Sequence, residues 1–174
     1  GIQKNGVAAC PKHFAVNSQE LRRMASDSIV DERTLREIYL TGFEMVVKEA
    51  HPKTIMSAYN LINGTYANEN AHLLQDILRK DWGFEGAVVT DWGGSNDHAL
   101  GVKNGSTLEM PCPGDDSIRE LIKAVQTGKI TEADVDARLE ELLEPAFTTK
   151  AAEDAAPSKF DADAHHALAR RAAA

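Results

Sequence analysis

Cysteine is scarce in this sequence. Of the 174 residues only Cys10 and Cys112 are cysteines, and they lie far apart in the chain. Two thiols cannot form the multi-bridge framework of a small secreted domain, and neither has Cys or His neighbours at the spacing of a zinc site. We interpret both as reduced thiols. His165 and His166 do not suggest a metal site either, because adjacent residues point about 100° apart on a helix.

An excess of positive charge and long apolar runs are also absent. Lys and Arg total 19 against 27 Asp and Glu, so the formal net charge is −8. This charge repels nucleic acids and anionic membrane surfaces, and it favours a neutral substrate over a phosphorylated one. No apolar run approaches the roughly 18 residues that a membrane span requires. We therefore predict a soluble protein without nucleic-acid or membrane partners.

Both ends of the chain lack features of natural termini. No methionine stands at position 1, residues 1–6 have no signal-peptide character, and the chain ends on three alanines. We expect a longer parent protein, on which a signal sequence could stand. The localisation of that parent is open between cytoplasmic and secreted.

Apolar residues are abundant enough for one buried core. Hydrophobic residues make up 43% of the chain, and 174 residues is the size of a single domain. Short apolar, β-prone stretches that precede polar or Gly/Pro-rich turns predict strands. These stretches are 7–10, 54–58, 87–90 and 107–110.

Helices are predicted between and after these strands. Apolar residues recur at three- and four-residue spacing from Leu35 to Ala50, after the acidic start Asp31-Glu32. Four more helices are expected: from the capping candidates Asn68 and Asn70 to Trp82-Gly83, from Ser117 to Gly128, from the capping-box-like start 131–134 through Leu143, and from near Asp161 across 165–174.

Strands that alternate with helices predict an α/β fold of parallel βα units. In such folds the functional residues follow the carboxyl ends of the strands. The pattern fades after Glu144-Pro145, and the small residues and proline of 148–157 predict a linker.

The end of the third predicted strand has the pattern of a catalytic carboxylate. Asp91 and Trp92 follow the apolar stretch 87–90, and Gly93-Gly94 then let the backbone turn sharply. A carboxylate there can attack an anomeric carbon, while the indole offers an apolar face to the C–H side of a pyranose. An aspartate after a strand is more often a helix cap or turn residue, so the spacing alone does not establish catalysis.

Five ordered motifs resemble those of glycoside hydrolase family 3, in particular its β-glucosidase-type members. They are Lys12-His13-Phe14, Arg23, Met56-Ser57-Ala58-Tyr59-Asn60, Thr90-Asp91-Trp92 and Leu108-Glu109-Met110-Pro111. The resemblance runs almost continuously from Gly6 to about Leu143.

The resemblance implies roles for these residues. Asp91 would be the catalytic nucleophile, and Lys12, His13 and Arg23 would donate hydrogen bonds to sugar hydroxyls. Taken singly, Lys12 is more simply a surface charge and His13 a loop imidazole; the ordered set favours binding.

The resemblance also assigns residues to the walls of the sugar site. Tyr59 would lie beside the nucleophile and Met56 would line the glycone pocket, although Tyr59 could instead be a core residue. Arg33 and Arg36 are interpreted as surface partners of nearby acids, without a functional role.

Departures from the family pattern narrow the prediction. Residues 15–20 replace the Pro-Gly-His loop of members that act on N-acetylated sugars, which favours a glucosidase or xylosidase.

The general acid of glucosidase-type members is a Glu in a second α/β domain, and it is absent here. Only four of the eight expected βα units are visible. We predict that 1–145 form the C-terminal half of a (β/α)8 barrel, and that 146–174 form a linker and the start of a helix leading to a missing α/β domain.

The predicted reaction of the parent is retaining hydrolysis of terminal β-D-glucosyl residues from a β-glucoside or oligosaccharide, with no cofactor and no metal. The alternatives are a β-xylosidase or broad exo-glycosidase, and a carbohydrate-binding fragment without catalysis. Because the outer strands of a half-barrel lack neighbours, we also predict self-association through exposed strand edges.

Overall fold

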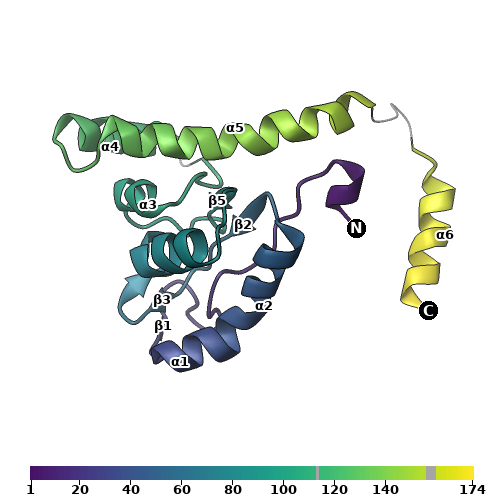
Figure 1. The fold of residues 1–174 in the computed structure, drawn as a ribbon, viewed down its shortest axis with the longest axis horizontal. Helices are drawn as coiled ribbons and strands as arrows, with labels where there is room; N and C mark the ends of the chain where they lie inside the picture. The colour runs from purple at the N-terminus through teal and green to yellow at the C-terminus, as the bar shows by residue number, and fades with distance from the viewer. Residues whose placement is uncertain (113, 156–159) are drawn as a thin grey trace.

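The computed structural model describes residues 1–112, 114–155 and 160–174. Its elements are η1 (Gln3–Asn5), β1 (Asp27–Ser28), α1 (Glu32–Thr34), η2 (Leu35–Leu40), α2 (Thr41–Met45), η3 (Val46–Ala50), β2 (Thr54–Met56), β3 (Leu61–Ile62), β4 (Thr65–Tyr66), η4 (Ala67–Glu69), η5 (His72–Asp81), β5 (Ala87–Val89), α3 (His98–Asn104), α4 (Asp115–Gln126), α5 (Glu132–Ala155) and α6 (Ala162–Ala173). Figure 1 shows β2 and β5 in the middle of the molecule, with α4 and α5 along one side and α1 and α2 along the other.

Two parallel strands form the centre of the fold. β2 pairs with β5, and Thr54 lies opposite Ala87 while Met56 lies opposite Val89. The strands predicted within 54–58 and 87–90 are confirmed, and so is the α/β class with parallel strands.

Extended segments flank this pair without forming regular strands. On one side the Thr54 N–H donates to the Ala9 carbonyl at 3.3 Å, and Phe14 forms a single parallel bridge with Ser57. On the other side Leu108 forms a single parallel bridge with Val89. The prediction of regular strands at 7–10 and 107–110 is therefore wrong. A physical reason is that prolines follow both stretches at 11 and 111, and proline has no N–H to donate to a ladder.

One face of the β2–β5 pair is buried and the other is partly open. Ile55 and Val88 are fully buried and belong to the main core cluster. Helix η5 contributes its apolar stripe to the same cluster: Leu73, Leu74, Ile77 and Leu78. The neighbouring Met56 and Val89 are only half-buried, because alternate residues of a strand point to opposite faces.

The first two predicted helices are confirmed. Residues 32–50 are helical throughout as α1, η2, α2 and η3, and the Asp31 carboxylate accepts the Thr34 N–H at 3.0 Å. Helix η5 follows Asn70, whose side chain accepts the Leu73 N–H at 3.0 Å. Arg36 pairs with Asp81 at 2.9 Å, as expected of a surface arginine.

A small second sheet was not predicted. β3 and β4 form an antiparallel hairpin, and β1 pairs with β3 in parallel. The turn residues Asn63 and Gly64 have φ of 51° and 85°, the left-handed values that Asn-Gly hairpin turns require. The Asn-Gly pair was the signal for this hairpin, but strands of two residues leave almost no alternating pattern.

The helices after β5 are partly as predicted. Helix α3 was missed, and it begins where the Asp97 carboxylate accepts the Leu100 N–H at 2.9 Å. α4 and the start of α5 are confirmed. The capping box of α5 joins the Thr131 N–H to the Asp134 carboxylate at 2.8 Å and the Asp134 N–H to the Thr131 hydroxyl at 3.2 Å.

Helix α5 is longer than predicted, so the linker assignment is wrong for its first part. The helix passes Pro145 and continues to Ala155. Alanine is the strongest helix former, which favours this extension, and the Thr149 hydroxyl donates to the Pro145 carbonyl at 2.7 Å. Pro157, on which the linker prediction also rested, lies outside the described residues. α6 begins at Ala162, next to the predicted start, and the Asp161 carboxylate caps it by accepting the Ala164 N–H at 3.0 Å.

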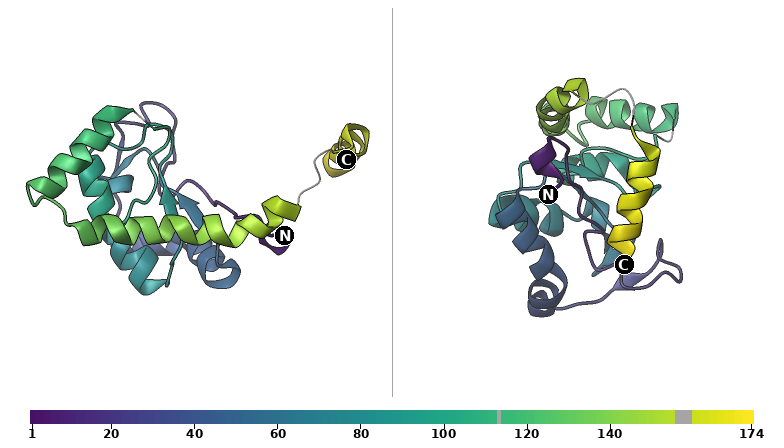
Figure 2. Two further views of the ribbon diagram at one scale, coloured as in Figure 1. Left: turned by 90° about the horizontal axis from the view of Figure 1, so that it is seen from above. Right: turned by 90° about the vertical axis from the view of Figure 1, so that its right-hand side faces the viewer.

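Buried charges attach α5 to the rest of the fold, and Figure 2 shows the long helix lying across it. Arg79 of η5 forms an ion pair with Glu141 of α5 at 2.8 Å, and the Thr107 hydroxyl donates to the same carboxylate at 2.7 Å. Burial lowers the pKa of Arg79 to about 10, so its guanidinium remains charged at neutral pH. None of the helices in the described ranges has the length and apolarity to cross a membrane.

Candidate active site

Asp91 stands at the carboxyl end of β5, with one oxygen fixed and the other facing a histidine. Its side chain is 13% exposed. Oδ1 accepts the Trp92 N–H at 2.8 Å, and Oδ2 lies 3.3 Å from His13 Nε2. The chain then turns at once, because the Gly94 N–H donates to the Asp91 carbonyl at 2.8 Å. The carboxylate is therefore oriented by its own backbone turn.

His13 reaches Asp91 because the next residue is anchored in the core. Phe14 is fully buried, and its ring packs edge-on against Phe43 and Trp82, with centroid distances of 5.1 and 5.8 Å. The His13 side chain itself is 31% exposed. The ring thus lies at the rim of the site, with one nitrogen toward the carboxylate and access to solvent.

Tyr59 forms a second wall beside Asp91. Its hydroxyl donates to the Trp92 carbonyl at 2.9 Å. Burial first, and then the neighbouring Asp91 carboxylate, raise the pKa of Tyr59, so the phenol is neutral at neutral pH and can donate a hydrogen bond. The guanidinium carbon of Arg23 lies 4.5 Å from the Tyr59 ring centroid, and Arg23 also pairs with Glu20 at 2.8 Å.

The other predicted residues lie around this group with fewer contacts. Met56 ends β2 on the partly open face of the strand pair, and the Trp92 residue is 50% exposed. Lys12 is exposed and forms no ion pair within the part of the chain that the structure describes. The contacts thus unite His13, Arg23, Tyr59, Asp91 and the Trp92 backbone, but not Lys12.

Two polar residues next to the site were missed. Glu69 and Asn68, in the turn η4, are 3% and 1% exposed. Their burial depends on packing against α3, which the sequence pattern did not predict. No local signal separates them from the surface polar residues that usually precede a helix.

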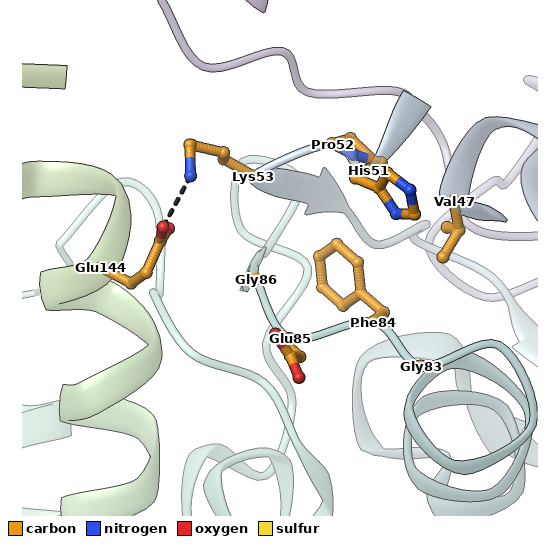
Figure 3. A pocket seen from close by; sticks show the side chains of 9 residues that line it. All are labelled: Val47, His51, Pro52, Lys53, Gly83, Phe84, Glu85, Gly86 and Glu144. Atoms are coloured by element: carbon orange, nitrogen blue, oxygen red, sulfur yellow. Dashed lines mark hydrogen bonds and ion pairs between the residues drawn. The ribbon is translucent and has the colours of Figure 1, made fainter. Parts of the chain in front are cut away.

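Among the described residues, neither a metal-ligand grouping nor the pocket at the other end of the strand pair coincides with this site. Within the described ranges, no cluster of three or more His, Cys, Asp or Glu side chains is arranged to hold a metal ion. A pocket of about 240 Å³ lies at the opposite end of the strand pair, where Lys53 precedes β2 and Gly86 precedes β5. Figure 3 shows Lys53 and Glu144 directed toward each other, with the Phe84 ring beside them in the pocket lining. The Lys53 ammonium donates to the Glu144 carboxylate at 2.6 Å.

Comparison with known proteins identifies the family. Residues 1–144 match the glycosyl hydrolase family 3 N-terminal domain. The thermostable β-glucosidase B of Acetivibrio thermocellus is 47% identical over 176 residues, which cover 100% of this chain and 23% of that protein. An exo-α-(1→6)-L-arabinopyranosidase of Bifidobacterium breve is 42% identical over 99% of this chain and 23% of its own length.

Solved structures agree. The β-glucosidase 3B of Thermotoga neapolitana in complex with glucose has a TM-score of 0.89 and 39% identity, over 95% of this chain and 24% of that one. This chain spans about a quarter of the length of these relatives. The resemblance seen in the motifs is confirmed: the chain belongs to glycosyl hydrolase family 3.

Proposed function

We propose that this chain carries the nucleophile of a retaining exo-β-glucosidase, and that Asp91 is that nucleophile. In the proposed reaction an Asp91 oxygen bonds to the anomeric carbon while the bond to the leaving-group oxygen breaks. Water then hydrolyses the resulting glycosyl ester and restores the carboxylate. A general acid outside the described residues protonates the leaving oxygen in the first step and activates the water in the second.

The observation that carries this proposal is the fixed orientation of the Asp91 carboxylate. The Trp92 N–H holds Oδ1 at 2.8 Å, so the side chain cannot rotate freely, and Oδ2 faces His13 across 3.3 Å. A nucleophile that is already oriented avoids much of the entropy loss of the bimolecular reaction. Thr90 is fully buried and continues the packing of β5, whereas the Asp91 side chain is 13% exposed and faces the site.

Neighbouring donors and an apolar surface support a sugar as the ligand. We propose that Lys12, His13 and Arg23 donate to the hydroxyls of the terminal sugar, and that the exposed Trp92 indole packs against its C–H face. Met56 and Tyr59 would form the walls. The relatives that were solved in complex with glucose support this choice of glycone.

We also propose that 1–145 form the C-terminal half of a (β/α)8 barrel and that 146–174 lead to a further α/β domain. Support comes from four parallel backbone segments that lie side by side in chain order, and from the partly open face that Met56 and Val89 share. Neither flanking segment pairs with a further strand in the described residues. We therefore expect self-association of the isolated chain, measured by sedimentation at several concentrations; a stable monomer throughout would contradict the open edges.

A broader exo-glycosidase is the second candidate. Two relatives at 42% identity are named exo-α-(1→6)-L-arabinopyranosidases, and a β-xyloside would present similar hydroxyls to the same donors. A carbohydrate-binding role without turnover is the alternative for the isolated chain, because the general acid is not among its recognised motifs.

Covalent labelling tests the proposal on the chain itself. A 2,4-dinitrophenyl 2-deoxy-2-fluoro-β-glucoside needs no general acid, because dinitrophenolate leaves unaided. We expect one glycosyl adduct by intact mass, mapped to Asp91 by peptide digestion, and none on Asp91→Asn. Adduct formation at another carboxylate would refute the assignment of Asp91. The corresponding xylosyl and arabinosyl reagents, compared by labelling rate, rank the alternative sugars.

A further inference from the structure

Glu69 is a buried carboxyl group outside the set that the motifs identify. It is 3% exposed, and in the part of the chain that the structure describes no other Asp, Glu, Lys or Arg residue is buried to this extent. Burial is the main influence on its pKa and raises it above the usual glutamate value. An ionisable group in the interior destabilises the fold unless it is hydrogen-bonded, so its partners indicate what it does.

The partners of Glu69 lie at both ends of α3. Its Oε1 accepts the backbone N–H of Asn96 at 2.8 Å and of Asp97 at 3.2 Å, directly before that helix. Its backbone carbonyl accepts the side-chain amide of Asn104, the last residue of the helix, at 2.6 Å. One residue of η4 therefore holds the loop that leads from β5 into α3.

A short series of hydrogen bonds continues from that loop to Asp91. The Asn96 side-chain amide donates to the Gly94 carbonyl at 3.3 Å, and the Gly94 N–H donates to the Asp91 carbonyl at 2.8 Å. Gly94 is buried, and a Cβ at that position would lie 3.1 Å from the Asp91 carbonyl oxygen. The turn is therefore tightly packed, and a shift of Asn96 would reach the Asp91 backbone through Gly94.

The adjacent Asn68 fixes the turn η4 itself. Its Oδ1 accepts the Ser57 hydroxyl at 3.0 Å and the Ser106 hydroxyl at 2.9 Å. Ser57 directly follows β2, and Ser106 stands just before the flanking segment at Leu108. The turn that carries Glu69 is thus attached to the strand region on both sides of β5 and gives the loop a rigid support.

We propose that Glu69 is a positioning residue: it holds the loop 92–97 so that Asp91 keeps its place against His13. Its effect on glycosylation rests on the function proposed above, whereas its effect on the loop rests on the contacts alone. What the loop requires is an acceptor oxygen, not a charge. An amide in place of the carboxyl should therefore work, and an isosteric hydrocarbon should not.

Three variants of the chain separate positioning from general stability. Glu69→Gln keeps an acceptor oxygen, and Glu69→Leu leaves two loop amides without a partner. Leu40→Ala is the stability control, because it truncates a fully buried side chain at the end of η2. The readouts are amide hydrogen exchange at Asn96 and Asp97, and the ring resonances of His13 in NMR spectra.

Glu69→Leu should speed exchange at the two amides by about tenfold or more and shift the His13 ring resonances. Glu69→Gln should preserve both, and Leu40→Ala should leave the His13 resonances in place. If Glu69→Leu does not fold, Asn96→Ala decides, because it removes only the side-chain bond to Gly94 and should still shift the His13 resonances. Unchanged His13 resonances in the folded variant, or a Gln variant that behaves like Leu, would overturn the proposal.

Labelling by the fluoro-glucoside then separates this proposal from the proposed function. The maximal labelling rate should fall at least tenfold in Glu69→Leu and stay within about twofold in Glu69→Gln. Equal rates in wild type and Glu69→Leu would refute positioning. An unlabelled wild type would instead refute the proposed function, and the exchange and resonance data would then decide the role of Glu69 alone.

Discussion

The two ends of the β2–β5 pair are both polar, but they are built differently. At the carboxyl end, Asp91 is 13% exposed and oriented by the backbone N–H of Trp92. At the amino end, Lys53 and Glu144 pair at 2.6 Å with side chains 32% and 46% exposed, beside the pocket of about 240 Å³. A well-formed pocket therefore lies at the end with the more solvated charges, and the oriented carboxylate lies at the other.

The comparison shows that a cavity and a set of oriented polar groups can lie at opposite ends of one strand pair. A solvated ion pair stabilises little and leaves both side chains free to move. A carboxylate that the backbone orients, with a neutral phenol and an imidazole beside it, has a defined direction of attack. Under the proposed function, the convergence of fixed polar groups, and not the pocket at the other end, marks the reactive end of the strand pair.

The largest effect is expected for a substitution of Asp91. Asp91→Asn keeps an oxygen for the Trp92 N–H but removes the proposed nucleophile, so labelling should fall by at least about 10³-fold, a barrier increase above about 4 kcal/mol. The free energy of unfolding should change by less than about 1 kcal/mol, because the hydrogen bond is retained. The rate of adduct formation and urea unfolding measure the two. The matched control Glu144→Gln, at the other end, should label at the wild-type rate; a slow control would remove the contrast between the ends.

Gly86 should give the largest stability effect, at the amino end. A Cβ there would lie 2.3 Å from the Lys53 carbonyl oxygen, which is backbone and cannot move aside freely. Gly86→Ala should therefore lower the free energy of unfolding by about 1–3 kcal/mol, the usual range for overpacking.

Gly42 in α2 is the control for this prediction, since nothing lies within 4 Å of a Cβ at that position. Gly42→Ala should raise the free energy of unfolding by about 0.5–1 kcal/mol through helix propensity. Urea unfolding of both variants gives the comparison. Equal stability of the two would show that the backbone of Lys53 does not lie close to Gly86.

Periodicity and strand-end order predicted much of this architecture. The apolar spacing of Leu73, Leu74, Ile77 and Leu78 predicted the helix that covers the sheet. Because parallel strands place their carboxyl ends at one edge, strand order predicted that the motifs would lie at that edge, and the family resemblance implied that Tyr59 lies beside Asp91.

The rest depended on contacts that leave no local pattern. The β3–β4 hairpin has strands of two residues, which are too short to show alternation. Helix α5 passes a proline that normally ends a helix, held by packing and by ion pairs such as Arg79–Glu141. Glu69 is bonded to both ends of α3, so its role could not be predicted before that helix was seen.

The pH dependence of stability distinguishes Glu69 from surface acids. Burial raises the pKa of Glu69 in the folded state. At pH values between its unfolded-state and folded-state pKa, the native chain therefore binds more protons than the unfolded chain. Its contribution is therefore fully present at low pH and is lost as the pH rises through the folded pKa. Glu69→Gln should be more stable than wild type at neutral pH, and the difference should vanish below the ordinary glutamate pKa of about 4.3. Thermal unfolding across this pH range measures the difference; a constant offset at every pH would contradict a raised pKa.

The smallest effect is expected for the Lys53–Glu144 pair. The two groups are 2.6 Å apart but roughly a third to a half exposed, so solvent screens their attraction. A double-mutant cycle with Lys53→Met and Glu144→Gln should give a coupling energy of about 0.2–1 kcal/mol, which falls as salt is added. Labelling at Asp91 should be unchanged in all three variants, because no described contact links this pair to the carboxyl end. A coupling well above 1 kcal/mol that resists salt would mean that the pair is effectively buried. The amino end would then resemble the carboxyl end, and exposure would no longer explain the contrast between them.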